Sequence, residues 1–206
     1  MVSEEAHEIA QSAPIWSIRS VPVPGNRIAP GAMLPLSVTT SIDVPRERVF
    51  AFLSELANRP AFTDRFIDGY HLERIPSSGV GAAARFRVGP ATARVWMETV
   101  IEELEPPHLI KERGRAGRLD RIPVFTAWEL LAGAGSTTEL TLTFWTEPSH
   151  SLDRLRERLG ARRWYRRHWS RALRRLKQLL EADTPVEPTR IAGEDRVPTL
   201  PRAVRH

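Results

Sequence analysis

Apolar and polar positions alternate with a period of two along most of the middle of the chain. Between two glycine-containing breaks, for example, Ala84, Phe86 and Val88 alternate with Arg85 and Arg87. Because successive side chains of a strand point to opposite faces, this pattern predicts strands with one face toward a core and the other toward water. It recurs in seven segments, with boundaries good to roughly 2–4 residues, at about 36–42, 70–76, 82–89, 93–104, 108–115, 120–132 and 136–147.

Short connections rich in glycine, serine and proline separate these segments. Examples are Ser77-Ser78-Gly79, Gly89-Pro90 and Gly133-Ala134-Gly135. Parallel strands need long crossovers, whereas connections of this length join hairpins. We therefore expect one antiparallel meander.

Helical spacing replaces the strand pattern between the first and second strands. A first helix is expected there, with a capping acid at Asp43 and a proline in its first turn at Pro45. Its apolar positions recur three and four residues apart, at Val49, Phe52, Leu53 and Leu56. Asn58-Arg59-Pro60 is expected to end this helix, and a second short helix or turn follows through Phe62 and Phe66.

A longer helix is expected from about residue 152 to residue 182. One apolar stripe runs along it at helical spacing, formed by Tyr165, Trp169, Ala172, Leu173, Leu176, Leu179 and Leu180. Three earlier leucines, at Leu152, Leu155 and Leu159, lie off the axis of that stripe. The phase changes at Gly160, so we expect a bend or a break there.

The 206 residues, 41% of them hydrophobic, suffice for one domain with tails. Residues 1–35 and 183–206 contain many prolines and no sustained period, so we expect a partly ordered extension and a disordered tail around a domain at 36–182. No apolar run reaches membrane-spanning length, and the N-terminus does not have the pattern of a secretory signal. The expected location is therefore the cytoplasm.

No residue pattern indicates metal, nucleotide or thiol chemistry. The chain has no cysteine, no His-Glu-x-x-His and no glycine-rich phosphate loop, so we expect neither a metal nor another cofactor. The acids that could move protons are Glu98, Glu112 and Glu129, because a carboxyl group turned into an apolar cavity would have a raised pKa. His168 is a further candidate. For each of the four, a position on a solvated strand or helix face is the favoured interpretation.

Several short motifs, taken in order, carry a family resemblance. They are Asp43-Val44-Pro45-Arg46-Glu47-Arg48-Val49-Phe50 at the first helix, Gly79-Val80-Gly81, Glu105-Pro106-Pro107, the hairpin Gly135-Ser136-Thr137-Thr138, and the helix ending from Leu173 to Glu181. With the order of strand, two short helices, six strands and long helix, the chain resembles the polyketide cyclase and START-related superfamily, which has the helix-grip fold of the birch pollen allergen. The resemblance covers about 36–182.

That resemblance implies an α+β fold, with a seven-stranded antiparallel sheet wrapped around the long helix and a cavity between them. Members bind lipids, sterols, polyketides or plant hormones, and some are aromatase/cyclases. The superfamily has no shared catalytic motif, so the resemblance assigns no catalytic residue.

A cavity in this fold would be lined by the inward faces of the strands and by the long helix, with a volume of about 300–1,000 Å³. In the segment 93–104 the uncharged face, which contains Val95, is expected to point inward, whereas a slip of one residue would turn Glu98 inward. The candidate ligand-binding residues are Phe62, Phe66, Phe86, Met97, Thr99, Ile101, Thr126, Trp128, Leu142, Phe144, Trp169 and Leu173. Filling a solid core is the alternative role of these side chains.

Three functions remain open. The first is binding of a hydrophobic small molecule, such as a lipid or a polyketide, and the second is a cyclase or dehydratase reaction in the same cavity. The third is docking to a protein or a membrane through the arginine-rich final helix, with transient contact to an anionic membrane by Arg163, Arg167, Arg171 and Arg174. These arginines do not share a helix face with Tyr165 and Trp169, so nucleic-acid binding is the less favoured partner.

Overall fold

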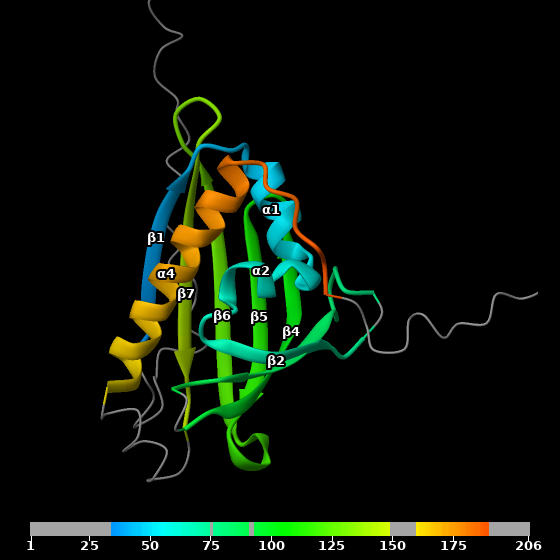
Figure 1. Ribbon diagram of the computed structural model, residues 1–206, viewed down its shortest axis with the longest axis vertical. Coiled ribbons are helices and arrows are strands. Elements are labelled where there is room, and N and C mark those ends of the chain that lie inside the picture. The colour runs from blue at the N-terminus through cyan, green and yellow to red at the C-terminus, as the bar shows by residue number, and fades with distance from the viewer. Residues whose placement is uncertain (1–33, 75, 91–92, 149–159, 190–206) are drawn as a thin grey trace, which may run out of the picture.

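The computed structural model describes residues 34–74, 76–90, 93–148 and 160–189. Seven antiparallel strands form one sheet, in the order β1-β7-β6-β5-β4-β3-β2. The strands are β1 (Leu36–Ile42), β2 (Ile67–Leu72), β3 (Ala83–Val88), β4 (Val95–Glu105), β5 (Leu109–Ala116), β6 (Ile122–Ala132) and β7 (Thr138–Thr146). The helices are α1 (Arg46–Ser54), η1 (Leu56–Asn58), α2 (Pro60–Thr63), η2 (Arg118–Asp120) and α4 (Arg162–Glu181). This is the predicted helix-grip α+β fold (Figure 1).

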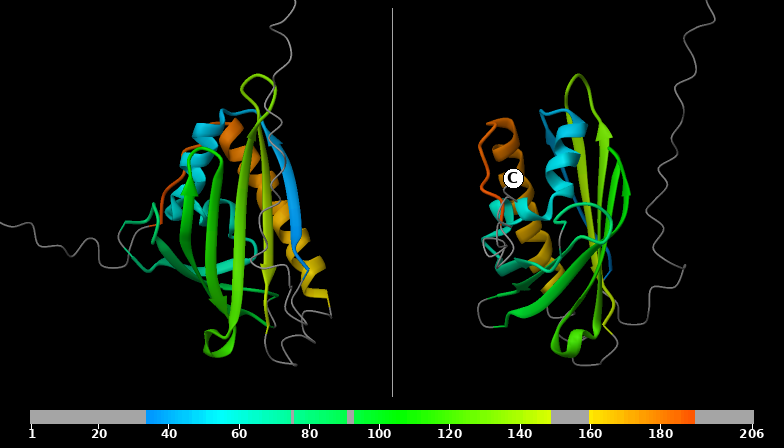
Figure 2. Two further views of the ribbon diagram at one scale, coloured as in Figure 1. Left: turned by 180° about the vertical axis from the view of Figure 1, so that it is seen from behind. Right: turned by 90° about the vertical axis from the view of Figure 1, so that its right-hand side faces the viewer.

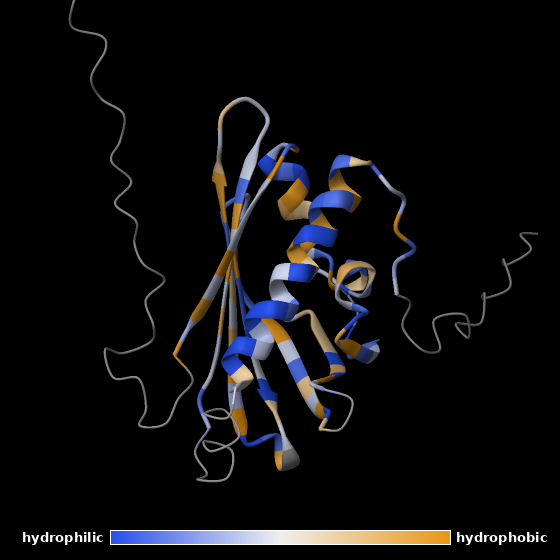
Figure 3. Cartoon of the chain, turned by 60° about the vertical axis from the view of Figure 1, so that its left-hand side comes forward, coloured by the Kyte–Doolittle hydropathy of each residue, from blue (hydrophilic) through white to orange (hydrophobic). Residues whose placement is uncertain are grey.

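Helices α1, α2 and α4 all lie on one side of the curved sheet (Figure 2). The longest of them, α4, packs against β1 and α2, and α1 packs against β6. Charged and apolar positions alternate along α4 (Figure 3), and its buried residues are Trp169, Ala172, Leu173, Leu176 and Leu180. The apolar stripe predicted from the sequence is therefore the surface with which α4 covers the sheet.

The inward face of the sheet follows the alternation in the sequence. On β4, Met97 and Ile101 are buried, whereas Trp96 on the other face is 41% exposed. This confirms the expected strand phase in 93–104 and places Glu98 on the outer face. The helices and the inner face of the sheet share one continuous hydrophobic core.

The second strand differs from its prediction. The sequence pattern predicts it at about 70–76, but it spans Ile67–Leu72, so it begins three residues and ends four residues earlier. The pairing with β3 shifts register between Asp68 and His71, and Gly69 lies in this irregularity with φ +57°. A glycine in a left-handed conformation within a bulge interrupts the alternation, so the pattern becomes regular only after it.

The predicted cap of the first helix is also wrong. Pro45 occupies the N-cap position of α1 and no side chain caps the helix. The Asp43 carboxylate instead accepts a hydrogen bond from Thr137 Oγ1 at 3.1 Å, and its backbone N–H donates to Glu181 Oε1 at 2.8 Å. Asp43 thus joins the β6–β7 hairpin to the end of α4.

The final helix begins at Arg162, two residues after Gly160, which has φ +114°. The helical segment predicted from about residue 152 up to Gly160 lies outside the described residues, as do residues 1–33 of the extension expected at 1–35. The first residues of the expected tail are described: the Thr189 N–H donates to the Ala57 carbonyl at 3.0 Å. The chain after α4 thus contacts the segment that follows α1.

Candidate ligand-binding site

One acidic side chain of the sheet points into the core. On β5 the inward positions alternate as Ile110, Glu112, Gly114 and Ala116, so Glu112 belongs to the face that packs beneath the helices. It is 5% exposed and pairs in register with Thr126 of β6. A charge at such a position is costly unless it is paired and hydrogen-bonded.

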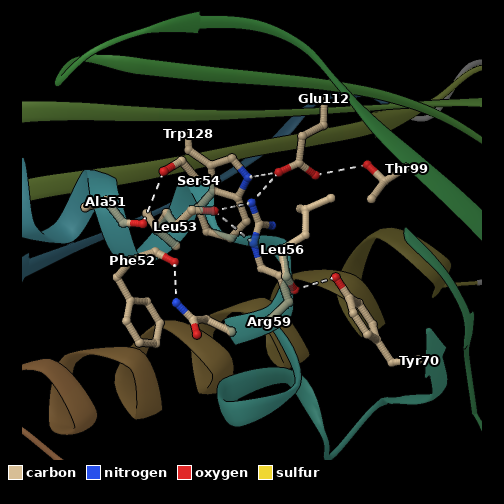
Figure 4. Close-up of polar contacts among 11 residues, drawn as sticks. Ala51, Phe52, Leu53, Ser54, Leu56, Arg59, Tyr70, Thr99, Glu112 and Trp128 are labelled. Carbon is tan, nitrogen blue, oxygen red and sulfur yellow. Dashed lines mark hydrogen bonds and ion pairs between the residues drawn. The ribbon is translucent and has the colours of Figure 1, made fainter. Parts of the chain in front are cut away.

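The partner of Glu112 comes from the turn between η1 and α2. Arg59 occupies the boundary between these short helices and is itself only 6% exposed. Its guanidinium donates to the Glu112 carboxylate and to the Leu53 carbonyl oxygen, the latter at 3.0 Å from Nη2 and 3.3 Å from Nε. It also lies over the Trp128 ring, with Cζ 4.5 Å from the ring centroid (Figure 4).

Two more donors complete the surroundings of the carboxylate. Trp128 Nε1 donates to Glu112 Oε1 at 2.8 Å, and Thr99 Oγ1 donates to Oε2 at 3.0 Å (Figure 4). The turn before α2, strand β4 and strand β6 thus all supply groups that donate to one acid. The arrangement fixes Glu112 as a hydrogen-bond acceptor and leaves little freedom for its carboxylate to swing toward a reacting group.

Tyr70 adds a neutral hydroxyl on the β2 side of the same region. Its OH donates to the Leu56 carbonyl at 2.8 Å, and its ring stacks on Phe86 with centroids 5.6 Å apart. Burial raises the pKa of Tyr70, and this effect outweighs the nearby positive charge of Arg59. The phenol therefore stays protonated and serves as a donor.

These groups border a small, largely enclosed cavity of about 30 Å³. Its polar lining consists of Arg59, Thr63, Tyr70, Thr99, Glu112 and Thr126, and its apolar lining of Ile67, Phe86, Met97, Val124, Phe144 and Trp169. One water needs roughly 10–15 Å³, so this space suits about two water molecules. The expected cavity of 300–1,000 Å³ is therefore not present in this conformation, because side chains from the sheet and from α4 fill the interior.

The predicted lining residues fall into three groups. Six of them border the enclosed cavity: Phe86, Met97, Thr99, Thr126, Phe144 and Trp169. Four are buried in the surrounding core without bordering it: Ile101, Trp128, Leu142 and Leu173. The remaining two, Phe62 and Phe66, line a separate open groove of about 800 Å³ between α2 and α4.

Aromatic side chains separate the cavity from the groove. Phe66, which lines the groove, contacts Trp169, which lines the cavity, with ring centroids 5.2 Å apart. Phe62 meets Trp128 edge-on at 6.3 Å. The Trp169 Nε1–H is buried and has no acceptor among the described residues. We call the Phe66–Trp169 pair the aromatic partition.

The other proton-transfer candidates lie away from the cavity. Glu98 and Glu129 lie on the outer face of the sheet, where Glu129 pairs in register with Thr141. Partial burial raises the pKa of Glu129, and nearby Lys111 opposes that shift. His168 Nδ1 donates to the Trp164 carbonyl at 2.8 Å and lines the groove. Of the four candidates, only Glu112 borders the enclosed space.

Sequence reasoning missed Arg59, Thr63, Ile67, Tyr70 and Val124 as lining residues. The Asn58-Arg59-Pro60 run has the pattern of a helix end, and nothing local distinguishes an inward arginine from a solvated one. Tyr70 stands at the predicted start of a strand. A half-buried tyrosine three residues after an apolar pair is a weak signal, because its inward direction depends on the bulge at Gly69.

The sheet of this protein wraps around one long helix, with a partly polar space between them. This arrangement is the helix-grip fold. The sequence matches the family described as polyketide cyclase / dehydrase and lipid transport over residues 33–181, and the chain belongs to that family. No curated protein matches the sequence significantly. None of the described helices has the length and hydrophobicity needed to cross a membrane.

Several solved structures share the fold. The aromatase/cyclase ZhuI from Streptomyces sp. R1128 superposes with a TM-score of 0.60 at 14% identity, covering 74% of this chain and 96% of that one. TTHA0849 from Thermus thermophilus has a TM-score of 0.59 at 15% identity, covering 74% and 100%. The major latex-like protein 151 from Panax ginseng has a TM-score of 0.51 at 13% identity, covering 71% and 97%. At these identities the likeness establishes the fold alone.

Proposed function

We propose that this protein binds a hydrophobic small molecule, lipid-like or polyketide-like, between the sheet and α4. The observation that carries the proposal is the concentration of polar groups around one small space in an otherwise apolar core. Arg59, Glu112 and Thr99 are linked by hydrogen bonds there, beside aromatic walls. Pockets for small molecules combine mostly apolar walls with a few placed polar groups.

Stability alone gives little reason for such a cluster. A buried ion pair is often no more stabilising than well-packed hydrophobic residues of similar volume. The side chains of Arg59 and Glu112 are 7% and 4% exposed, so both charges have lost their hydration. A role in orienting the polar end of a ligand accounts for their position at the cavity wall.

A ligand reaches this space by displacing the aromatic partition. The present volume of about 30 Å³ is too small for a lipid or a polyketide. Rotation of Phe66 and Trp169 would join the cavity to the groove on the other side of these rings. Trp169 would then offer its buried and unpartnered Nε1–H to a polar atom of the ligand.

Binding without chemistry is favoured over a cyclase or dehydratase reaction. The one acid that borders the cavity is held by three donors, and Tyr70 stays protonated. A general base needs a free lone pair within hydrogen-bond reach of the proton it removes. If the protein were an enzyme, the same cavity would contribute by folding and positioning a flexible substrate.

Native mass spectrometry of freshly purified protein tests the proposal. We expect a bound hydrophobic molecule, released on denaturation, in the wild-type protein and in Thr141→Phe, which adds the same bulk on the outer face of β7. Thr126→Phe, which fills the cavity, should lose it. Retention of the same molecule by a folded Thr126→Phe variant would place binding elsewhere.

A further inference from the structure

The open groove between α2 and α4 has a chemistry of its own. Its lining includes the half-buried Leu179 and the edges of Phe62 and Phe66, whose rings are only 2% and 4% exposed, and its volume is about 800 Å³. Arginines Arg65, Arg171 and Arg174 form part of its wall. A groove of this volume falls in the size range of small-molecule sites, about 300–1,000 Å³.

The three wall arginines are exposed and have no ion-pair partner in the described parts of the chain. Their neighbour Arg175 differs, because its Nη1 donates to both Asp64 carboxylate oxygens, at 2.7 and 2.9 Å. Arg171 and Arg174 are three residues apart on α4, so their like charges lie close together and repel. An anion held between them would remove that repulsion.

We propose that this groove binds an amphipathic small-molecule anion. The flat or aliphatic body lies against Leu179 and Ala182, beside the small exposed edge of Phe66, and a carboxylate, sulfonate or phosphate group contacts Arg65, Arg171 and Arg174. Arginine suits this role, because its planar donors match the geometry of such oxyanions and its charge persists at all relevant pH values. The inference goes beyond the enclosed cavity, since it does not require the aromatic partition to open.

A small molecule fits this surface better than a membrane does. Binding to a bilayer would need an exposed convex face. The exposed arginines that lie outside the groove, such as Arg163 and Arg167, are nearer the start of α4. The unpartnered arginines of the groove instead share one hollow with Leu179 and Ala182, so a single bound group can contact more than one of them.

A matched pair of ligands and a matched pair of variants test the inference by isothermal titration calorimetry. The ligands are naphthalene-2-carboxylate and its neutral counterpart naphthalene-2-carboxamide. The variants are Arg171→Gln/Arg174→Gln, in the groove, and Arg163→Gln/Arg167→Gln, which removes the same charge from the same helix outside it. We expect saturable binding of the carboxylate, about tenfold weaker in the groove variant and within about twofold of wild type in the control, because each exposed charge contributes a factor of a few.

The carboxamide should bind the wild type about tenfold more weakly than the carboxylate, and adding NaCl to about 0.5 M should reduce that difference. Equal losses in the two variants, or no saturable carboxylate binding to the wild type, would overturn the inference. Binding to vesicles of phosphatidylglycerol and phosphatidylcholine is measured with the same proteins. Vesicle binding that depends on Arg171 and Arg174, without carboxylate binding, would assign the groove to a membrane and also overturn it.

Discussion

The Arg59 guanidinium donates to the Glu112 carboxylate inside the core, and this bond joins the turn after α1 to strand β5, 53 residues further along the chain. The pair therefore fixes the position of the short helices over the sheet as well as the polar side of the cavity. Because both groups have left water, the loss of one leaves the other as an unbalanced buried charge.

Glu112→Gln should destabilise the protein by about 3 kcal/mol or more, since it leaves the Arg59 charge buried without its counterion. Urea unfolding monitored by circular dichroism measures this loss. Glu139→Gln makes the same change at an exposed position of β7 and should alter stability by less than about 0.5 kcal/mol. A similarly small effect of Glu112→Gln would show that the Arg59–Glu112 pair does not fix the position of the short helices over the sheet.

The double replacement Arg59→Met/Glu112→Leu should recover most of the stability that Glu112→Gln loses, because hydrophobic residues of similar volume often replace a buried ion pair without net cost. The same protein should bind hydrophobic ligands differently, since the polar wall of the cavity is gone. Urea unfolding together with native mass spectrometry checks both parts. A stable double variant that retains the wild-type ligand would show that ligand binding does not require the ion pair.

Stability should fall above pH 10 in a way that depends on Tyr70. Burial raises the pKa of Tyr70 above its usual value of 10.0, so at higher pH the unfolded chain loses this proton while the folded protein keeps it. The stabilisation is complete below pH 10 and is lost at up to about 1.4 kcal/mol per pH unit as the pH rises toward the folded-state pKa. Urea unfolding between about pH 9 and pH 11 should show a shallower decline in Tyr70→Phe. Parallel declines in the two proteins would contradict this assignment.

Gly114→Ala should disrupt the pairing of β4 and β5. A Cβ atom at this position would overlap the Glu98 carbonyl oxygen of the neighbouring strand, and backbone cannot yield as a flexible side chain does. We expect a loss of about 3 kcal/mol or more in urea unfolding. Gly135→Ala, which adds a Cβ in open space at φ +63°, should cost only about 1–2 kcal/mol. Equal costs would show that β4 can move away from Gly114.

The periodic pattern of the sequence identified the strands and the long helix, and the family resemblance supplied their arrangement as a helix-grip fold. Alternation such as Ala84, Phe86 and Val88 identifies a strand and its inner face without any knowledge of its neighbours, and the stripe through Trp169 and Leu173 does the same for α4. The error at β2 has a local origin, because the conformation of Gly69 hides the start of the strand.

The candidate site could be predicted only in part, for a physical reason. Its apolar wall, including Phe86 and Phe144, follows from strand phase. The Arg59–Glu112 pair does not, since each residue lies in a locally polar run and only the tertiary fold brings them together. The volume of the cavity depends on how side chains such as Trp169 fill the interior. The hydrophobic periodicity of the sequence does not predict this packing.

The most direct test of binding behind the aromatic partition is the indole N–H signal of Trp169 in a ¹⁵N–¹H NMR titration with 2-naphthol, a flat molecule with one hydroxyl. Trp169 Nε1 is buried and unpartnered among the described residues, whereas Trp128 Nε1 already donates to Glu112. We predict a saturable shift that is larger for Trp169 than for Trp128, and its loss in Thr126→Phe. Unchanged indole signals in the wild-type protein at saturating 2-naphthol would contradict the account.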